Sequence, residues 1–246
     1  MMLKGNIIHF MNISSQDDKK MSEYFGQHRE NDWKLWNLPQ FLSIPTEDVG
    51  VWGIPFAKRC DHIPARLMPF NYAIGKDADF TAGVHFFIND YQFERVWRNP
   101  GKYIEILSRF DCIIAPDFSV YSDMPTAMQI WQHYKSRMFG YMCYQAGLNV
   151  IPNMIFSDSR TYSQRYGFVF DGIESGGTVC LSTSGCRRSK EYRKGIVDGL
   201  KAFLDVCTPR TIIVYGDAPE IDCGNIEIIE FQPFGFGKQF ISERKK

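Results

Sequence analysis

The sequence lacks any long hydrophobic run, and it has no excess of charge of either sign. No window approaches 18 consecutive apolar residues, so no membrane-spanning segment is expected. Lysine and arginine together number 28, as do aspartate and glutamate. This balance argues against a protein coated with basic residues for nucleic-acid binding, although a local basic groove needs only a few clustered cations.

Familiar catalytic signatures are also missing. The sequence has no GxxxxGK[ST], no GxGxxG after the first expected strand, no GxSxG, no HExxH and no paired-histidine motif of rolling-circle nickases. These motifs cradle phosphates, expose a nucleophile or bind a catalytic metal, so their absence argues against the common nucleotide hydrolases, dinucleotide oxidoreductases and α/β-hydrolases.

The seven cysteines form no CxxC pair, and their number is odd. This pattern predicts reduced thiols that are not paired in disulfides and do not bind metal. The N-terminal run MMLKGNIIHFMNI is too polar for a secretory signal, so a cytoplasmic protein is expected.

What is present indicates a globular α/β protein. A chain of 246 residues with 44% hydrophobic and 23% charged residues can bury one large core. Helical patterns separate six apolar runs, and parallel neighbouring strands require such crossovers. We expect an α/β fold with a mainly parallel sheet and interleaved helices, either open or resembling an incomplete barrel. The expected strands lie near 67–72, 84–88, 111–115, 149–155, 178–182 and 211–215.

The chain divides into three expected parts. Residues 1–56 are predicted to be an irregular arm and a lid rich in tryptophan and proline, residues 57–234 the α/β domain, and residues 235–246 a basic tail. A long helix is expected to begin at an Asp123 cap and to end at Gly147. Its expected apolar face consists of Met128, Trp131, Tyr134, Met138, Tyr141 and Met142.

Polar residues follow the expected strands at the points where the apolar runs stop. In parallel sheets the carboxyl ends of the strands gather at one edge, where ligands bind. Asp117 is the strongest candidate, because it follows Pro116 directly and lies six residues before the helix cap expected at Asp123. The expected ligand-binding residues are Asn71, Ser119, Tyr121, Ser182, Ser184 and Arg187.

Carboxylates at this edge suggest catalysis or cation binding. Asp117, Asp90, Asp123 and His85 are the candidate catalytic residues, and Asp90 with Asp117 supplies oxygen ligands for Mg2+ or Mn2+. Each candidate except Asp117 has a structural alternative. Asp90 and Asp123 stand where helix caps are wanted, and His85 lies within an apolar strand where a core histidine is common.

Six blocks of the chain resemble a known family. They are LMPFNYA (67–73), GVHFFINDYQFERVW (83–97), FDCIIAPDFSVYSDMP (110–125), QAGLNVIP (145–152), FVFDGI (168–173) and TIIVYG (211–216). These blocks look like domain of unknown function 4417, a family that occurs in phages, prophages and other mobile elements. The similarity runs from about Arg66 to Phe231, and PDFS-x-Y-x-DMP is its most specific part. The resemblance implies a mobile-element context and supplies no catalytic residues.

Three hypotheses follow for the function. The first is a metal-assisted enzyme that acts on a nucleic acid or nucleotide through the aspartates. The second is a non-enzymatic phage or mobile-element protein that contacts a host or replication protein through aromatic residues. The third is a nucleic-acid-binding module that uses the basic residues 187–194, Arg160, Arg165 and the tail, and the neutral net charge weakens it. Carboxylates gathered in a pocket favour the first over the second.

Overall fold

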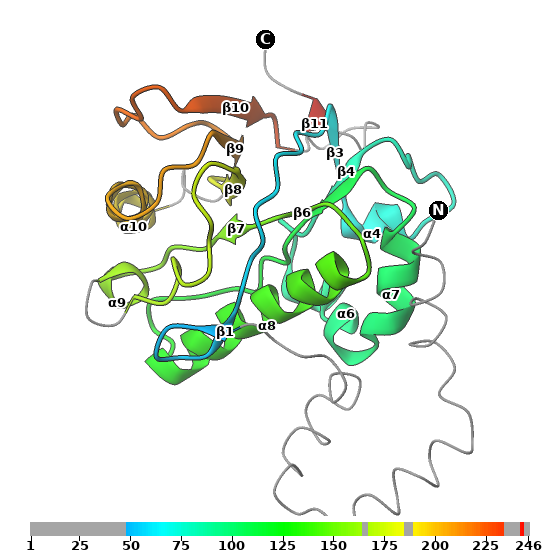
Figure 1. The fold of residues 1–246 in the computed structure, drawn as a ribbon, viewed down its shortest axis with the longest axis horizontal. Coiled ribbons are helices and arrows are strands. Elements are labelled where there is room, and N and C mark those ends of the chain that lie inside the picture. Colours follow the sequence, from blue (N-terminus) through cyan, green and yellow to red (C-terminus); the bar gives the residue numbers. More distant parts are fainter. Residues whose placement is uncertain (1–47, 164–166, 185–188, 234–241, 244–246) are drawn as a thin grey trace, which may run out of the picture.

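The computed structural model describes residues 48–163, 167–184, 189–233 and 242–243, and its centre is a curved wall of parallel strands (Figure 1). A short antiparallel hairpin, β1 and β2, precedes the wall. The strands of hairpin and wall are β1 (Asp48–Val49), β2 (Ile54–Pro55), β3 (Arg66–Pro69), β4 (Gly83–His85), β5 (Cys112–Ile114), β6 (Val150–Ile151), β7 (Asn153–Met154), β8 (Thr178–Ser182), β9 (Thr211–Tyr215), β10 (Glu227–Phe231) and β11 (Ser242–Glu243).

The wall consists of two sheets that meet at Pro152. One sheet has the order β11-β3-β4-β5-β6 and the other has the order β10-β9-β8-β7. Strands β6 and β7 are one extended run that Pro152 interrupts, because proline has no N–H to donate to a ladder. The Pro152 carbonyl still accepts from the Cys180 N–H at 2.8 Å, which keeps β8 beside the junction.

Within each of the stretches β3–β6 and β7–β10, every strand lies beside its neighbour in the chain, and all of these pairs are parallel. This sequential order is that of a barrel wall, whereas doubly wound sheets reverse direction at a switch point. The inner surface buries side chains from both sheets, and the His85 ring on β4 lies 4.4 Å from the Tyr215 ring on β9. The wall therefore curves around its own core, as an incomplete barrel does.

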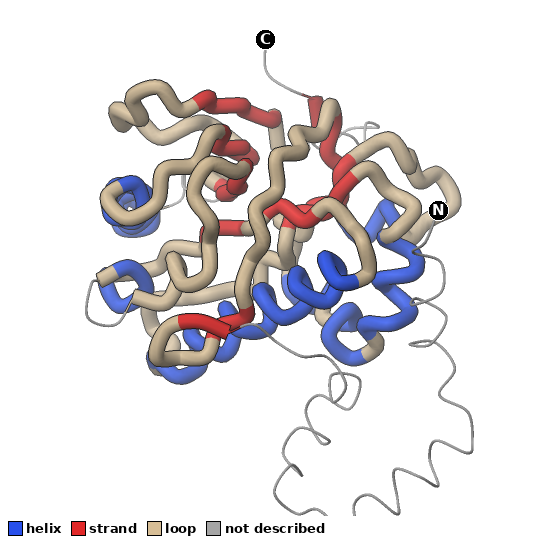
Figure 2. Tube along the Cα trace, in the orientation of Figure 1, coloured by secondary structure: helices blue, strands red, loops and turns tan. Residues whose placement is uncertain are grey.

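Helices cover the outer surface of the wall (Figure 2). One outer core lies between β3–β5 and the helices from α4 to α8, and a second lies between β7–β9 and the last helices. Because both faces of the central strands are covered, β9 is buried along its whole length. The helices are α4 (Phe70–Ala73), α5 (Asp90–Phe93), α6 (Arg95–Arg98), α7 (Pro100–Leu107), α8 (Thr126–Gln145), α9 (Ser159–Tyr162) and α10 (Lys190–Leu204).

The predicted fold class is confirmed, and each of the six predicted runs contains a strand of the parallel wall. The first run differs in extent, because its residues from Phe70 onward form α4. The parallel pairing with β4 ends at Pro69, and the Phe70 side chain turns into the outer core, where it stacks on Phe86.

The prediction for the long helix is correct at its end and wrong at its start. Gly147 has φ +87 directly after the C-cap Ala146, the left-handed geometry that glycine adopts at helix ends. The N-cap is Pro125 and no side chain caps the helix, so the expected Asp123 cap is wrong. The expected apolar face is also wrong in its first half, because Met128 and Trp131 are 52% and 40% exposed.

Among the described cysteines, all six are free thiols, and Cys186 lies outside the described residues. The part of the expected arm that covers residues 1–47 lies outside them as well. No helix in the described ranges is long and apolar enough to cross a membrane.

Candidate functional site

Asp117 lies at the carboxyl edge of the wall, three residues after β5 ends. Its Oδ1 accepts from the Asn153 amide at 2.8 Å, and Asn153 stands at the first position of β7. Burial raises the pKa of the Asp117 carboxyl to about 6; the Asn153 hydrogen bond opposes this shift, and the nearby charge of Asp90 adds to it. The side chain therefore titrates close to neutral pH, where a general acid or base is most effective.

A pocket opens at this edge between the ends of β7 and β8 and the start of α10. It encloses about 260 Å3, including its open mouth. Its lining combines the Asp117 carboxyl with the Ser182 hydroxyl and otherwise apolar or aromatic side chains. The lining residues are Asp117, Met154, Ile155, Phe156, Leu181, Ser182, Tyr192 and Ile196. Polar groups placed among apolar side chains in a concavity are typical of small-molecule sites.

The loop from Pro116 to Met124, which carries Asp117, is held by the polar face of α8. Ser136 donates from Oγ to the Pro116 carbonyl at 2.5 Å, and Gln132 donates to the Ser119 carbonyl at 3.1 Å. The buried Gln129 amide donates to the carbonyls of Tyr121 and Met124, both at 3.1 Å. These bonds fix the loop backbone at successive positions, so Asp117 is presented by a rigid segment.

Asp90 and Arg160 hold the same loop from its two sides. The Asp90 carboxylate accepts from the Ser119 N–H at 3.1 Å and from the Ser119 hydroxyl at 2.7 Å. Arg160 on α9 donates to the carbonyls of Ser122 and Met124 at 2.5 and 3.2 Å, while Asp158 pairs with its guanidinium at 2.6 Å. The structure thus brings Asp90, Ser119 and Asp117 together, with Asp90 supporting the loop.

The other predicted site residues are distributed differently. Ser182 lines the pocket and Ser184 follows it, with the two hydroxyl oxygens 3.0 Å apart. Tyr121 is 58% exposed and Asp123 is exposed at the loop surface. Asn71 lies in α4 and does not line the pocket; its buried Oδ1 has no hydrogen-bond partner within the described ranges. Arg187 lies outside the described residues.

His85 lies inside the curved wall and does not reach the pocket lining. Its Nδ1 accepts from the Phe87 N–H at 3.1 Å, and its ring packs against Phe87 and Tyr215. Complete burial lowers the pKa of His85 to about 3, so the ring is neutral at physiological pH. Its surroundings are those of a core histidine.

A cluster with the donor types of a metal site lies at the opposite edge of the wall. His62, Asp111 and Cys112 bring one potential ligand atom each to within 4.8 Å of one another. His62 Nε2 and Asp111 Oδ2 are 2.7 Å apart, so these two side chains contact each other directly in an ordinary hydrogen bond or ion pair. Burial raises the pKa of the Cys112 thiol well above its usual value, so this thiol stays protonated.

Sequence analysis missed the residues that hold the loop and complete the pocket. Gln129, His133, Ser136 and Arg137 recur at helical spacing and are all buried, so a polar stripe on α8 was the available signal. It was hidden because the same helix carries an apolar stripe at similar spacing. Tyr192 and Ile196 gave no signal, since an amphipathic helix of a surface layer shows the same pattern.

Comparisons with known proteins match the part of the chain that contains this site and the six sequence blocks quoted above. The sequence profile of the domain of unknown function DUF4417 matches residues 46–232. The Gene 1 protein of Mycobacterium phage L5 is 32% identical over 183 residues, which cover 74% of this chain and 78% of the phage protein. The Gene 1 protein of Mycobacterium phage D29 is 32% identical over 182 residues, which cover 73% and 66%. No solved structure matches significantly. The profile spans the wall from β3 to β10 and the loop that carries Asp117, and the chain therefore belongs to the DUF4417 family.

Proposed function

We propose that this protein is an enzyme that acts on a nucleotide or nucleic acid, with Asp117 as its general base. The observation that carries the proposal is a carboxyl group with a pKa of about 6 in a pocket at the carboxyl edge of parallel strands. The bonds that hold the surrounding loop add the rigidity that catalytic positioning requires.

The two oxygens of Asp117 suit different tasks. Oδ1 is held by the Asn153 amide, whereas no described residue donates a hydrogen bond to Oδ2. At pH 7 a group with a pKa of about 6 is mainly ionised, so Oδ2 is ready to accept a proton from a water or hydroxyl nucleophile. Asn153 is a positioning residue, since it orients the carboxylate and stabilises its charged form.

Three features support a phosphate-bearing substrate. Ser182 lines the same pocket as Asp117, and the Ser184 hydroxyl lies 3.0 Å from the Ser182 hydroxyl. Tyr192, in the first turn of the 15-residue helix α10, lines the pocket, so the positive end of this helix lies nearby; the Tyr192 N–H itself donates to Ser189 Oγ at 3.2 Å. The relatives with matching sequence are phage proteins, and phage genomes supply nucleic-acid and nucleotide substrates.

Asp90 and Asp117 remain the proposed oxygen ligands for Mg2+ or Mn2+. Both oxygens of Asp90 already accept from Ser119. A cation shared by the two carboxylates would use the remaining lone pairs of Asp90 together with Asp117. The proposed proton transfer uses Asp117 alone, and the hydrolysis screen tests metal dependence.

The experiment is a hydrolysis screen of nucleoside mono-, di- and triphosphates and short single- and double-stranded oligonucleotides, with EDTA, Mg2+ or Mn2+. Activity should rise about tenfold per pH unit below pH 6 and level off above it, because Asp117 must be ionised. Asp117→Asn should lower the rate at least about 100-fold, the usual contribution of a general base.

The Asn153→Ala variant distinguishes a role of Asn153 in positioning the Asp117 carboxylate from a role in folding alone. Because the Asn153 hydrogen bond lowers the pKa of Asp117, its loss should move the acid limb of the pH profile upward. The His62→Asn variant is the control for metal effects, since His62 belongs to the cluster at the other edge. An activity that survives Asp117→Asn, or whose pH limb stays fixed in Asn153→Ala, would remove Asp117 from the mechanism.

A non-enzymatic protein that contacts a host or replication protein is the second candidate. The observation in its favour is an aromatic surface on α6 and α8, where Trp131 is 40% exposed, stacks on Tyr134 and packs edge-on against Trp97. A phage growth assay distinguishes the candidates. If growth requires Asp117, the enzyme is favoured; if growth tolerates Asp117→Asn but fails with Trp131→Ala, the binding protein is favoured.

A further inference from the structure

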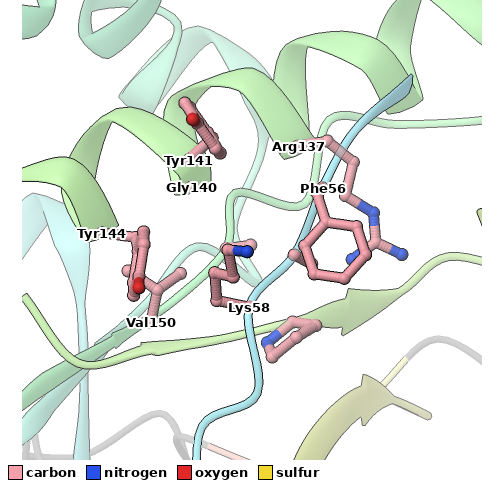
Figure 3. A pocket seen from close by; sticks show the side chains of 10 residues that line it. Phe56, Lys58, Arg137, Gly140, Tyr141, Tyr144 and Val150 are labelled. Carbon is pink, nitrogen blue, oxygen red and sulfur yellow. The ribbon is translucent and has the colours of Figure 1, made fainter. Parts of the chain in front are cut away.

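A second pocket lies on the outer side of the wall, between α8 and the segment that follows β2. It encloses about 300 Å3, including its open mouth, and shares no lining residue with the Asp117 pocket. Figure 3 shows Arg137 reaching down from α8 beside the Phe56 ring, with Lys58 between that ring and Tyr144. The lining residues are Phe56, Ala57, Lys58, Ala115, Arg137, Gly140, Tyr141, Tyr144, Val150 and Pro152.

Arg137 is a buried cation with an unused donor group. Its side chain is 2% exposed; Nη2 donates to the Val169 carbonyl at 2.9 Å and Nε donates to His133 Nε2 at 3.3 Å. Nη1 is buried and has no hydrogen-bond partner among the residues that the structure describes. A guanidinium removed from water with an unsatisfied donor is costly to the fold unless another group pairs with it.

No described carboxylate forms an ion pair with Arg137. Burial lowers the pKa of Arg137 to about 10, so the guanidinium remains charged at neutral pH. Asp171 favours the charged form through its field, but it makes no salt bridge with Arg137. His133 cannot compensate the charge, because burial lowers the pKa of His133 and its ring is neutral.

The pocket itself has the composition of an anion site. Its lining contains two cations, Arg137 and Lys58, and two tyrosines, and it contains no acidic residue. Lys58 is partly exposed, and its Nζ lies 4.6 Å from the centre of the Phe56 ring. Besides Phe56, the remainder of the pocket lining consists of Ala57, Ala115, Gly140, Val150 and Pro152.

We propose that this pocket binds a small oxyanion group, a phosphate or carboxylate, through Arg137 and Lys58. The anion pairs with Arg137 Nη1 in the interior and with the Lys58 ammonium at the mouth. A planar guanidinium matches the geometry of both oxyanions, so the same site accepts either source. The bound anion completes the hydrogen bonding of a buried cation, and it stabilises the fold by mass action.

The experiment titrates the full chain with inorganic phosphate, acetate or chloride at constant ionic strength, and it follows the melting temperature and binding heat. Phosphate or acetate should raise the melting temperature saturably, while chloride should not. Side-chain 15N–1H NMR should show a shift of the Arg137 guanidinium signals, assigned by comparison with Arg137→Lys. If phosphate gives the larger saturable effect, the natural ligand carries a phosphate group; if acetate does, the natural ligand carries a carboxylate group.

Lys58→Gln tests the site without removing a buried charge, and Lys102→Gln is its matched control. Lys102 also lies over an aromatic ring, 5.6 Å from the centre of Tyr103, but it does not line the pocket. Lys58→Gln should weaken the saturable binding at least fivefold, and Lys102→Gln should leave it unchanged. The proposal is overturned if no anion binds saturably, if both variants respond equally, or if the Arg137 signals do not move.

Discussion

Replacement of Asp117 by asparagine should stabilise the folded protein at neutral pH. The carboxyl is held in a partly buried position where burial and Asp90 disfavour its charge, as its pKa of about 6 indicates. Asparagine has nearly the same shape and keeps an oxygen that accepts from the Asn153 amide. The substitution therefore removes the unfavourable charge and keeps the hydrogen bond.

The magnitude follows from the pKa difference. The ordinary value is 3.8 and the folded value is about 6, and each unit corresponds to about 1.4 kcal/mol, so a fully buried group would contribute about 3 kcal/mol. Asp117 keeps some exposure at the pocket, and about 2 kcal/mol is a better expectation. Between pH 4 and 6 the folded protein binds more protons than the unfolded chain, so wild-type stability falls as pH rises through this window.

Urea unfolding of wild type and Asp117→Asn at pH 4, 5, 6, 7 and 8 measures the effect as a difference between the two proteins. The gain should be close to zero at pH 4, should grow between pH 4 and 6, and should level off above pH 6 at about 2 kcal/mol. Asp123→Asn, at an exposed position of the same loop, is the matched control for replacing a loop carboxylate by an amide. If Asp117→Asn instead became less stable than wild type as the pH rises, the Asp117 carboxylate would be favourably paired in the folded protein. That result would refute the reasoning.

Three further outcomes are expected in unfolding measurements. Gly199→Ala should destabilise by about 1–3 kcal/mol, because the new Cβ would lie 2.6 Å from the Phe156 ring, whereas Gly101→Ala, with open space at its Cβ, should stabilise by up to about 1 kcal/mol. His85→Phe should make the free energy of unfolding less dependent on pH below pH 6.5. Because the pKa of His85 is about 3 in the folded protein and 6.5 in the unfolded chain, only the unfolded chain binds this proton as the pH falls below 6.5, and wild type loses about 3 kcal/mol of stability by pH 4.5. Ser136→Ala should cost about 1–3 kcal/mol, because it leaves the carbonyl at the start of the Asp117 loop unpaired.

The sequence alone determined the fold class and the positions of the parallel strands. Strands buried on both faces read as continuous apolar runs, and β8 and β9 coincide with two such runs. The position of Asp117 was predictable for the same reason, because it directly follows an apolar run that ends at the edge where parallel sheets bind ligands. These features depend on residues near one another in the chain.

Tertiary structure decided the role of each polar side chain. Asp90 and Asp123 look alike in sequence, but Asp90 accepts hydrogen bonds from Ser119, 29 residues away, whereas Asp123 is exposed. Helix α8 shows the strongest effect of packing: polar residues such as Arg137 face the protein, while Trp131 faces outward. Hydrogen bonds to distant carbonyls compensate the burial of polar groups, and local periodicity contains no information about those partners.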